Sequence, residues 1–425
     1  MEAYAQVLSY AIPGFVLLIL IEELVGRMRG IRVNRAMDTI SSLSSGMTNT
    51  LKSLIGLTIV IVSYDWMVSH IALVDIKSSA WLFVLAFIGH DFAGYWSHRF
   101  NHEINVFWNR HIVHHSSEEF NLSCALRQSI SSVVSIYFFL YIPMALLGIP
   151  TLIVATVAPL HLFAQFWYHT RLIDKMGWLE YIIVTPSHHR VHHAINPEYI
   201  DKNYGQIFIF WDKWFGTFQP ELPDVPAVYG TKKPANTWNP IIINYQHMWL
   251  LAKDAWRTSS LWDKVRLWFM PTGWRPKDVA EKYPIEIVED VYKRPKYDTP
   301  APMGLKAWSW AQLIIHNLLM YYIMTMIADI GVGDMVLFCS FLFVSIFAYT
   351  TLMDRHRLAI PFELIKLVMG FLMFTRMESW YMLDNYIPGA SIVIGSYLLV
   401  SFLVACYYTF SQSPVTEKLS AQNTI

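Results

Sequence analysis

Three short histidine clusters stand out in this chain. Twelve of its sixteen histidines lie between positions 90 and 193, among strongly apolar segments. The clusters follow the pattern H-x3-H once and H-x2-H-H twice; their members are His98, His102, His111, His114, His115, His189, His192 and His193. Residues at positions i, i+3 and i+4 share one face of a helix, so each cluster can direct two or three imidazoles at one point. Imidazoles that converge in this way indicate a metal site.

The number of histidines favours two metal ions over one. A zinc site needs three or four ligands, and imidazole alone does not distinguish iron, zinc, copper and nickel. The zinc-peptidase motif H-E-x-x-H is absent, because Val106 stands where its second histidine would follow His102-Glu103. The Glu-x-x-His motif of soluble di-iron bundles is missing as well. A histidine-only site for two metals beside a membrane favours O2 activation by iron, acting on an apolar substrate that arrives from the lipid.

The elements that must position these histidines belong to a membrane protein. Of the 425 residues, 54% are hydrophobic and only 15% are charged, against about a quarter charged in soluble domains. The net charge is zero and no basic stripe is present, which argues against nucleic acid as a partner. Cys124, Cys339 and Cys406 are far apart without a C-x-x-C motif, which argues against a disulfide framework or a thiolate metal site.

The apolar segments predict an all-α fold with about nine transmembrane or re-entrant helices, since one crossing takes ~20 helical residues. The first run has no positively charged start and no small-residue cleavage site, so we expect a retained helix and not a signal peptide. The pair at 130–169 has an alternative, a hairpin that enters the bilayer only partly. The predicted spans are residues 4–25, 51–74, 80–98, 130–148, 151–169, 306–328, 334–353, 358–377 and 390–410.

Positive residues in the short loops predict the orientation of this polytopic integral membrane protein. Arg27, Arg29, Arg32 and Arg35 follow the first span, and further arginines accompany the histidine clusters, whereas the opposite loops carry almost none. We therefore expect the N-terminus outside, and the C-terminus and the histidine-rich di-metal site on the cytoplasmic side. This membrane would be the endoplasmic reticulum in a eukaryote and the inner or cell membrane in a bacterium.

The histidine pattern resembles that of the fatty acid hydroxylase (sterol desaturase) superfamily of integral-membrane di-iron oxygenases. This resemblance covers about residues 80–220 and is very specific; besides the clusters it includes His90-Asp91, Trp108, Asn203-Tyr204-Gly205 and the run from Trp211 to Thr217. Over most of the chain, further segments are similar to the alkylglycerol monooxygenase branch. These segments are residues 116–123, 127–129, 160–166, His169-Thr170 and the hydrophobic C-terminal third.

The resemblance implies two irons per chain, held by the eight cluster histidines, that activate O2 and hydroxylate a lipid C–H bond. In the alkylglycerol branch the carbon is the one next to the ether oxygen, the products are an aldehyde and a glycerol, and the reductant is tetrahydrobiopterin. The chain has no cytochrome b5-like His-Pro-Gly-Gly motif and no Rossmann glycine motif, so the electron donor must be external. The domains we expect are N-terminal membrane helices (1–79), the di-iron domain (80–220), an interfacial aromatic and Pro-rich segment of loops and short helices (221–304), and C-terminal membrane helices (305–425).

Further residues are candidates for the site. The family often adds a ligand at the position of His169, but the extra H-x3-H of some fatty acid hydroxylases is absent, which leaves the ninth and tenth ligands open. Glu103 and Asp91 are predicted as the acids of the catalytic site, where either would orient a ligating imidazole; a solvated acid at the headgroup level is the alternative. The remaining candidates are His90, His161, His188, Asn203 and Asp212. We expect them to support the ligands, and the three histidines could also bind metal. An ordinary helix cap or turn is the alternative.

Three alternative functions remain open. The same histidine frame would serve a fatty-acyl or sterol hydroxylase or desaturase. A metal transporter is a different class, but transport predicts polar residues strung through several spans, whereas here they gather at one face. A catalytically inactive structural protein is the third alternative, although no motif is broken. The sequence does not identify the lipid.

Overall fold

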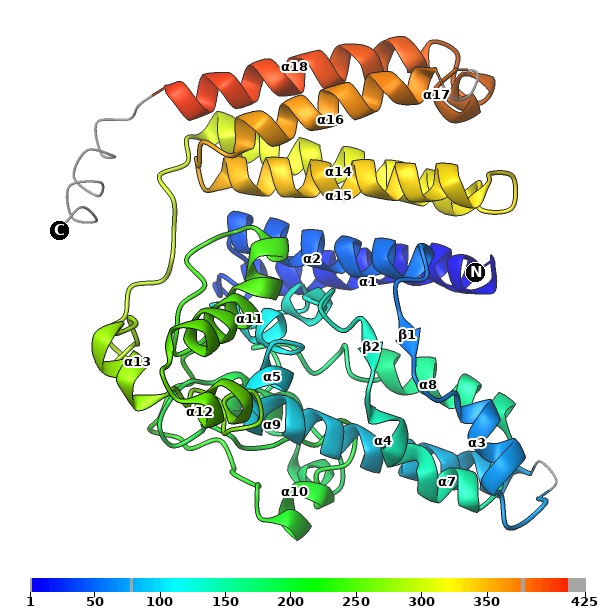
Figure 1. Cartoon of the computed structure of the whole chain (residues 1–425), viewed down its shortest axis with the longest axis vertical. Helices are drawn as coiled ribbons and strands as arrows, with labels where there is room; N and C mark the ends of the chain where they lie inside the picture. Colours follow the sequence, from blue (N-terminus) through cyan, green and yellow to red (C-terminus); the bar gives the residue numbers. More distant parts are fainter. Residues whose placement is uncertain (1, 77–78, 376–378, 412–425) are drawn as a thin grey trace.

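The computed structural model describes residues 2–76, 79–375 and 379–411, and it is predominantly helical (Figure 1). The long helices at the two ends of the chain lie side by side as a stack of layers, with the histidine-bearing part beside α1 and α2. The stacked helices are α1 (Glu2–Met28), α2 (Ala36–Leu54), α14 (Met303–Thr325), α15 (Val332–Met353), α16 (Ala359–Phe374) and α18 (Ala390–Phe410); the short α17 (Ser379–Met382) and η4 (Leu383–Asn385) precede α18.

Three of the described helices are long and apolar enough to cross a membrane, by length and composition: residues 6–28 of α1, then α15 and α18. Together with the apolar composition they identify a membrane protein. The predicted spans at 306–328, 334–353 and 390–410 coincide with α14, α15 and α18 to within three residues, and the one at 358–377 coincides with α16 up to the end of the described range. The total of about nine spans remains a prediction.

Two predicted spans are wrong as continuous helices. The segment 51–74 contains the end of α2, the short strand β1 (Ile59–Val60) and α3 (Tyr64–Ile71). Helix α2 stops because Gly56 takes a positive φ of 66° while Leu57 N–H donates to Lys52 O at 3.1 Å, a common helix ending. The segment 130–148 breaks into β2 (Val134–Ser135), η2 (Tyr137–Tyr141) and α7 (Ile142–Leu146). Together with α8 (Thr151–Phe163), these short elements match the hairpin alternative better than two crossings.

Helix α2 is a polar helix that the hydropathy pattern did not predict. Its buried serines and threonines bond to both neighbouring parts of the molecule: Ser44 Oγ lies 2.6 Å from Tyr349 Oη of α15, and Ser42 Oγ accepts from Arg127 Nε at 2.8 Å. Asp38 completes the second contact, with Oδ1 2.7 Å from Arg127 Nη2. Arg127 follows the second histidine cluster, so α2 fixes this cluster against the helix stack.

The histidine-bearing part is built around α4 (Ala80–Glu103), a 24-residue helix with α8 packed along it. Short elements complete this part of the molecule: α5 (Asn105–Trp108), α6 (Ile112–His115), η1 (Cys124–Leu126), η3 (Gly177–Tyr181), α9 (Pro186–His193) and α10 (Phe210–Phe215). The expectation of only short helices in 221–304 was wrong, since α11 (Pro240–Arg257) has 18 residues; α12 (Leu261–Arg266) and α13 (Lys277–Lys282) follow it.

Candidate metal centre

The structure brings nine histidines together in two groups at the C-terminal end of α4. Within each group, one ring nitrogen per residue lies within 4.8 Å of all the others. The five-histidine group consists of His98, His102, His111, His115 and His192, and the four-histidine group consists of His114, His169, His189 and His193. The two groups adjoin, because the rings of His115 and His193 stack with centroids 4.3 Å apart.

Each H-x2-H-H cluster serves both groups. In the second cluster, His111 and His115 (i, i+4) join the five-histidine group while His114 joins the other. In the third cluster, on α9, the assignment is reversed: the i, i+4 pair belongs to the four-histidine group and His192 joins the other. Each short helical segment therefore stands between the two groups and directs rings to both sides.

Backbone carbonyls orient four of the rings. The Nδ1–H groups donate to carbonyl oxygens at 2.8 Å for His98 to Tyr204, 3.1 Å for His192 to Lys202, 3.2 Å for His114 to Arg127 and 3.0 Å for His169 to Gln165. A proton on Nδ1 leaves Nε2 as an unprotonated acceptor. All four of these rings therefore turn an Nε2 lone pair inward.

Several inward Nε2 atoms lie close together, and those of His114 and His169, 3.3 Å apart, both lack a proton because each ring donates from Nδ1. The Nε2 atoms of His98 and His111 are 2.9 Å apart, and that of His189 lies 2.9 Å from His169 and 3.1 Å from His193. The buried Nε2 atoms of three more rings have no hydrogen-bond partner; these are His102, His115 and His192. Lone pairs this close repel one another unless a cation lies between them, and two imidazoles on one metal, each ~2.0–2.1 Å from it, have nitrogens about 3 Å apart.

Burial keeps these rings neutral, the form that binds metal. Burial, and then the neighbouring His193 ring, lower the pKa of His115 well below its usual value. The pKa of His193 is lowered in the same direction by burial and by His114. The residues thus meet the requirements of a two-metal, all-nitrogen centre.

Asp212 and Asn203 hold the loop that lies next to the five-histidine group. The carboxylate of Asp212 accepts from Tyr204 N–H at 2.7 Å, Gly205 N–H at 2.8 Å and Thr217 Oγ1 at 2.7 Å. Asn203 Nδ2 donates to the carbonyl of Gln219 at 2.7 Å. These contacts fix the loop whose Tyr204 carbonyl orients His98. The sequence pattern includes Tyr204 but predicts no role for it, because a backbone carbonyl leaves no signal in residue type.

Asp91 lies outside the two groups, where it holds a loop. Its fully buried carboxylate accepts from the backbone N–H groups of Ile207 at 2.9 Å and Phe208 at 3.2 Å, and from Trp211 Nε1 at 2.8 Å. Its Oδ1 also lies 2.6 Å from His161 Nε2. The ring of His161 packs against that of His90 with centroids 4.8 Å apart, and neither histidine is a member of the two groups.

Glu103 and His188 also lie apart from the clustered nitrogens. Glu103 pairs with Arg99 one turn earlier on α4 at 2.9 Å and is partly exposed. His188 Nδ1 accepts from Thr185 N–H at 3.4 Å and so caps the start of α9. The contacts seen for these two residues are thus an ion pair and a helix cap, and their roles at the site stay predictions.

Two acids after the second cluster tie the site to a distant segment. The carboxylate of Glu118 binds the guanidinium of Arg294 and accepts from Tyr297 N–H at 2.5 Å. Its neighbour Glu119 pairs with Lys296 at 2.6 Å. Ion pairs and a backbone hydrogen bond thus account for both acids.

Comparisons with known proteins agree with this geometry. The fatty acid hydroxylase family model matches residues 83–217. The chain is 34% identical to alkylglycerol monooxygenase from Homo sapiens, over 88% of this chain and 84% of that protein, and 32% identical to alkylglycerol monooxygenase from Danio rerio, over 99% and 93%. It is also 29% identical to an ornithine lipid hydroxylase from Rhizobium tropici, over 36% of this chain and 46% of that one. No solved structure matches the chain.

Proposed function

The chain belongs to the alkylglycerol monooxygenase family, and on this premise we propose that it hydroxylates the ether-adjacent carbon of alkylglycerols at a di-iron centre. Family membership makes it a lipid-hydroxylating oxidoreductase. One atom of O2 would enter the lipid, and the other would leave as water with two electrons from a reductant. The hydroxylated carbon is then a hemiacetal carbon, which collapses to a fatty aldehyde and a glycerol.

The observation that carries this proposal is the pair of histidine groups. The five-histidine group would hold one iron and the four-histidine group the other, and together the irons would supply O2 activation. The protein's own residues hold the rings neutral and directed inward, through burial and through the carbonyls of Tyr204, Arg127, Lys202 and Gln165. Asp91, Glu103 and His188 would act at a distance, through packing and loop structure.

The proposal includes the remaining components. Tetrahydrobiopterin from outside the chain would supply electrons, the lipid would arrive from the bilayer, and the arginine-rich loops favour a cytoplasmic position of the histidines. The division at residues 79, 220 and 304 goes with this proposal: the di-iron domain lies between N-terminal and C-terminal membrane helices.

Metal content and turnover on purified protein test the proposal together. We expect about two irons per chain, by the count of histidine groups, and fatty aldehyde from an alkylglycerol only when tetrahydrobiopterin is present. His115→Ala and His193→Ala should each reduce the iron content, through different groups. His247→Gln is the matched control, since His247 Nε2 bonds the Asn105 carbonyl at 2.9 Å and belongs to neither group.

Other outcomes would redirect or refute the proposal. Two irons without aldehyde would favour an acyl-lipid substrate, which the similarity to an ornithine lipid hydroxylase supports as second candidate. Absence of iron, or tightly bound zinc alone, would refute the di-iron centre.

A further inference from the structure

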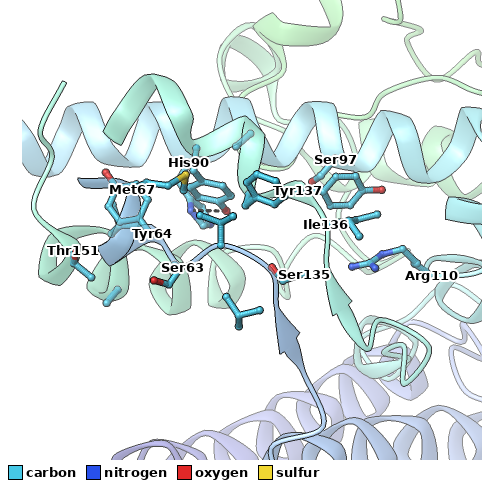
Figure 2. A pocket seen from close by; sticks show the side chains of 18 residues that line it. Ser63, Tyr64, Met67, His90, Ser97, Arg110, Ser135, Ile136, Tyr137 and Thr151 are labelled. Carbon is cyan, nitrogen blue, oxygen red and sulfur yellow. Dashed lines mark hydrogen bonds between the residues drawn. The ribbon is translucent and has the colours of Figure 1, made fainter. Parts of the chain in front are cut away.

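A cavity of about 480 Å³ lies alongside α4, apart from the two histidine groups (Figure 2). Its walls come from β1 and α3, from α4, from the segment 135–141 and from α8. The volume falls within the ~300–1,000 Å³ typical of sites for small molecules. None of the nine grouped histidines lines it, so it is a separate feature of the molecule.

The cavity is elongated along α4. Figure 2 shows Tyr64, Met67 and Thr151 toward one end, and Ser97 and Arg110 toward the other. The α4 residues that line it run from His90 to Ser97, and this alone corresponds to about 10 Å of helix rise. The shape suits an extended chain better than a compact ring system.

Apolar residues make up much of the long wall between these ends, which His90 and Tyr141 also line, and the wall is open at one side. Val60, Ala93, Val154, Ala155 and Ala158 contribute to it. Val60 is 56% exposed, and Ala155 is also exposed. Exposed apolar residues at the rim of a cavity suit contact with lipid, so a hydrocarbon chain can enter this cavity from the side.

The end at Arg110 is cationic and has no acidic partner. The guanidinium Nη1 donates to the Val134 carbonyl at 2.8 Å and lies over the Tyr137 ring, 5.3 Å from its centroid. Among the described residues no carboxylate pairs with Arg110, and the nearby Lys52 bonds only the carbonyls of residues 129 and 132. A half-buried cation beside an apolar wall needs oxygen acceptors, and a lipid headgroup supplies them.

This cationic end also adjoins the five-histidine group. Arg110 directly precedes His111, and Ser97 directly precedes His98. The headgroup end of a lipid bound here would thus lie one residue along the chain from His98 and His111, whereas its chain end would lie toward Tyr64 and Thr151.

We propose that this cavity binds the hydrocarbon chain of a single-chain lipid, with an oxygen-rich headgroup at Arg110 and the chain end at Tyr64 and Thr151. This inference rests on the proposed function and extends it: the cavity sets the chain length accepted, and it explains oxidation at a carbon close to the headgroup. The headgroup oxygens are those of a free glycerol or of a glycerol phosphate.

Ala155→Trp tests the chain site, because the new ring fills the middle of the apolar wall. Thr156→Trp is the matched control: its neighbour on α8 is exposed and does not line the cavity. Binding of octadecyl and decyl glycerols is measured on full-length protein in lipid nanodiscs, by displacement of a fluorescent fatty acid. Ala155→Trp should lower the affinity for the octadecyl relative to the decyl lipid by about tenfold or more, the effect of excluding two methylenes, and Thr156→Trp should leave the ratio unchanged. Ala155→Leu, a smaller change, gives a second measurement should the tryptophan variant fold poorly.

Arg110→Gln tests the headgroup end with two lipids, an alkylglycerol and its phosphate ester. An equal loss of affinity for both supports recognition of glycerol oxygens, and a larger loss for the phosphate ester supports recognition of phosphate. No loss for either lipid, or an unchanged chain-length ratio in both Ala155 variants, would overturn the site even if aldehyde is formed. Chain-length-dependent binding without aldehyde would instead refute the proposed function and leave the site standing.

Discussion

Replacing Asp212 by asparagine should weaken one metal position and spare the other. The carboxylate holds Tyr204 N–H and Gly205 N–H with separate oxygens, at 2.7 and 2.8 Å. Asparagine offers one oxygen and one NH2 group, so one buried N–H loses its acceptor at a cost of about 1–3 kcal/mol. The loop then loosens around the Tyr204 carbonyl that orients His98. Loss of such outer support typically costs about 10–100-fold in metal affinity.

The assay is competition for iron with a graded series of chelators, followed by metal analysis. Since His98 belongs to the five-histidine group alone, the expected curve has two phases: one iron is lost early and the other is retained as in the wild type. Asp254→Asn is the matched control, because Asp254 is equally buried and pairs with Arg275 at 2.6 Å without contacting the site. It should lower thermal stability and leave iron affinity unchanged. Equal iron affinity in Asp212→Asn and wild type, or an equal loss in Asp254→Asn, would refute the idea that Asp212 supports His98 through the Tyr204 loop.

Three further predictions concern buried charges. Lys366→Met should destabilise the C-terminal helices by about 3–5 kcal/mol, because the fully buried Glu363, 3.1 Å from the ammonium, loses its positively charged partner. Thermal unfolding of this variant and of the double variant Lys366→Met with Glu363→Gln checks the prediction. An equal loss of stability in both variants would contradict it. Burial raises the pKa of Asp354 to about 6, above its value of about 4 in the unfolded chain; stability from this group therefore falls as pH rises from about 4 to about 6, by up to about 3 kcal/mol. The unfolding temperature of Asp354→Asn should lack this component, and identical pH profiles would exclude it. Asp91→Asn should lower thermal stability while turnover per bound iron stays near wild type; a selective loss of turnover at full iron occupancy would instead restore a catalytic role for this acid.

The grouping of nine histidines could be predicted from sequence, but its internal division could not. Helical spacing allows all three rings of an H-x2-H-H cluster to point to one place. The division depends on α9 lying opposite the second cluster. His114 then joins a different group from His111 and His115, and His192 joins a different group from His189 and His193. Whether a given imidazole reaches one metal position or the next depends on packing between segments that lie far apart in the chain.

The missed elements have physical causes too. Helix α2 escaped notice because hydropathy measures contact with lipid, whereas its serines and threonines face other helices. Asp91 was expected among the acids of the catalytic site because a carboxylate inside an apolar helix is expensive. The cost of burial does not reveal the partners of this carboxylate. They are backbone N–H groups of a loop more than a hundred residues further along the chain.

The ion pairs of Glu118 and Glu119 can form only late in the synthesis of the chain. Their partners Arg294 and Lys296 lie 176 and 177 residues further along the chain. During synthesis, the segment after the second histidine cluster therefore remains without these clasps until about two-thirds of the chain has left the ribosome. The last of the nine grouped histidines, His193, emerges about a hundred residues before that point. All nine histidines are thus present in the nascent chain well before Glu118 and Glu119 can pair with Arg294 and Lys296.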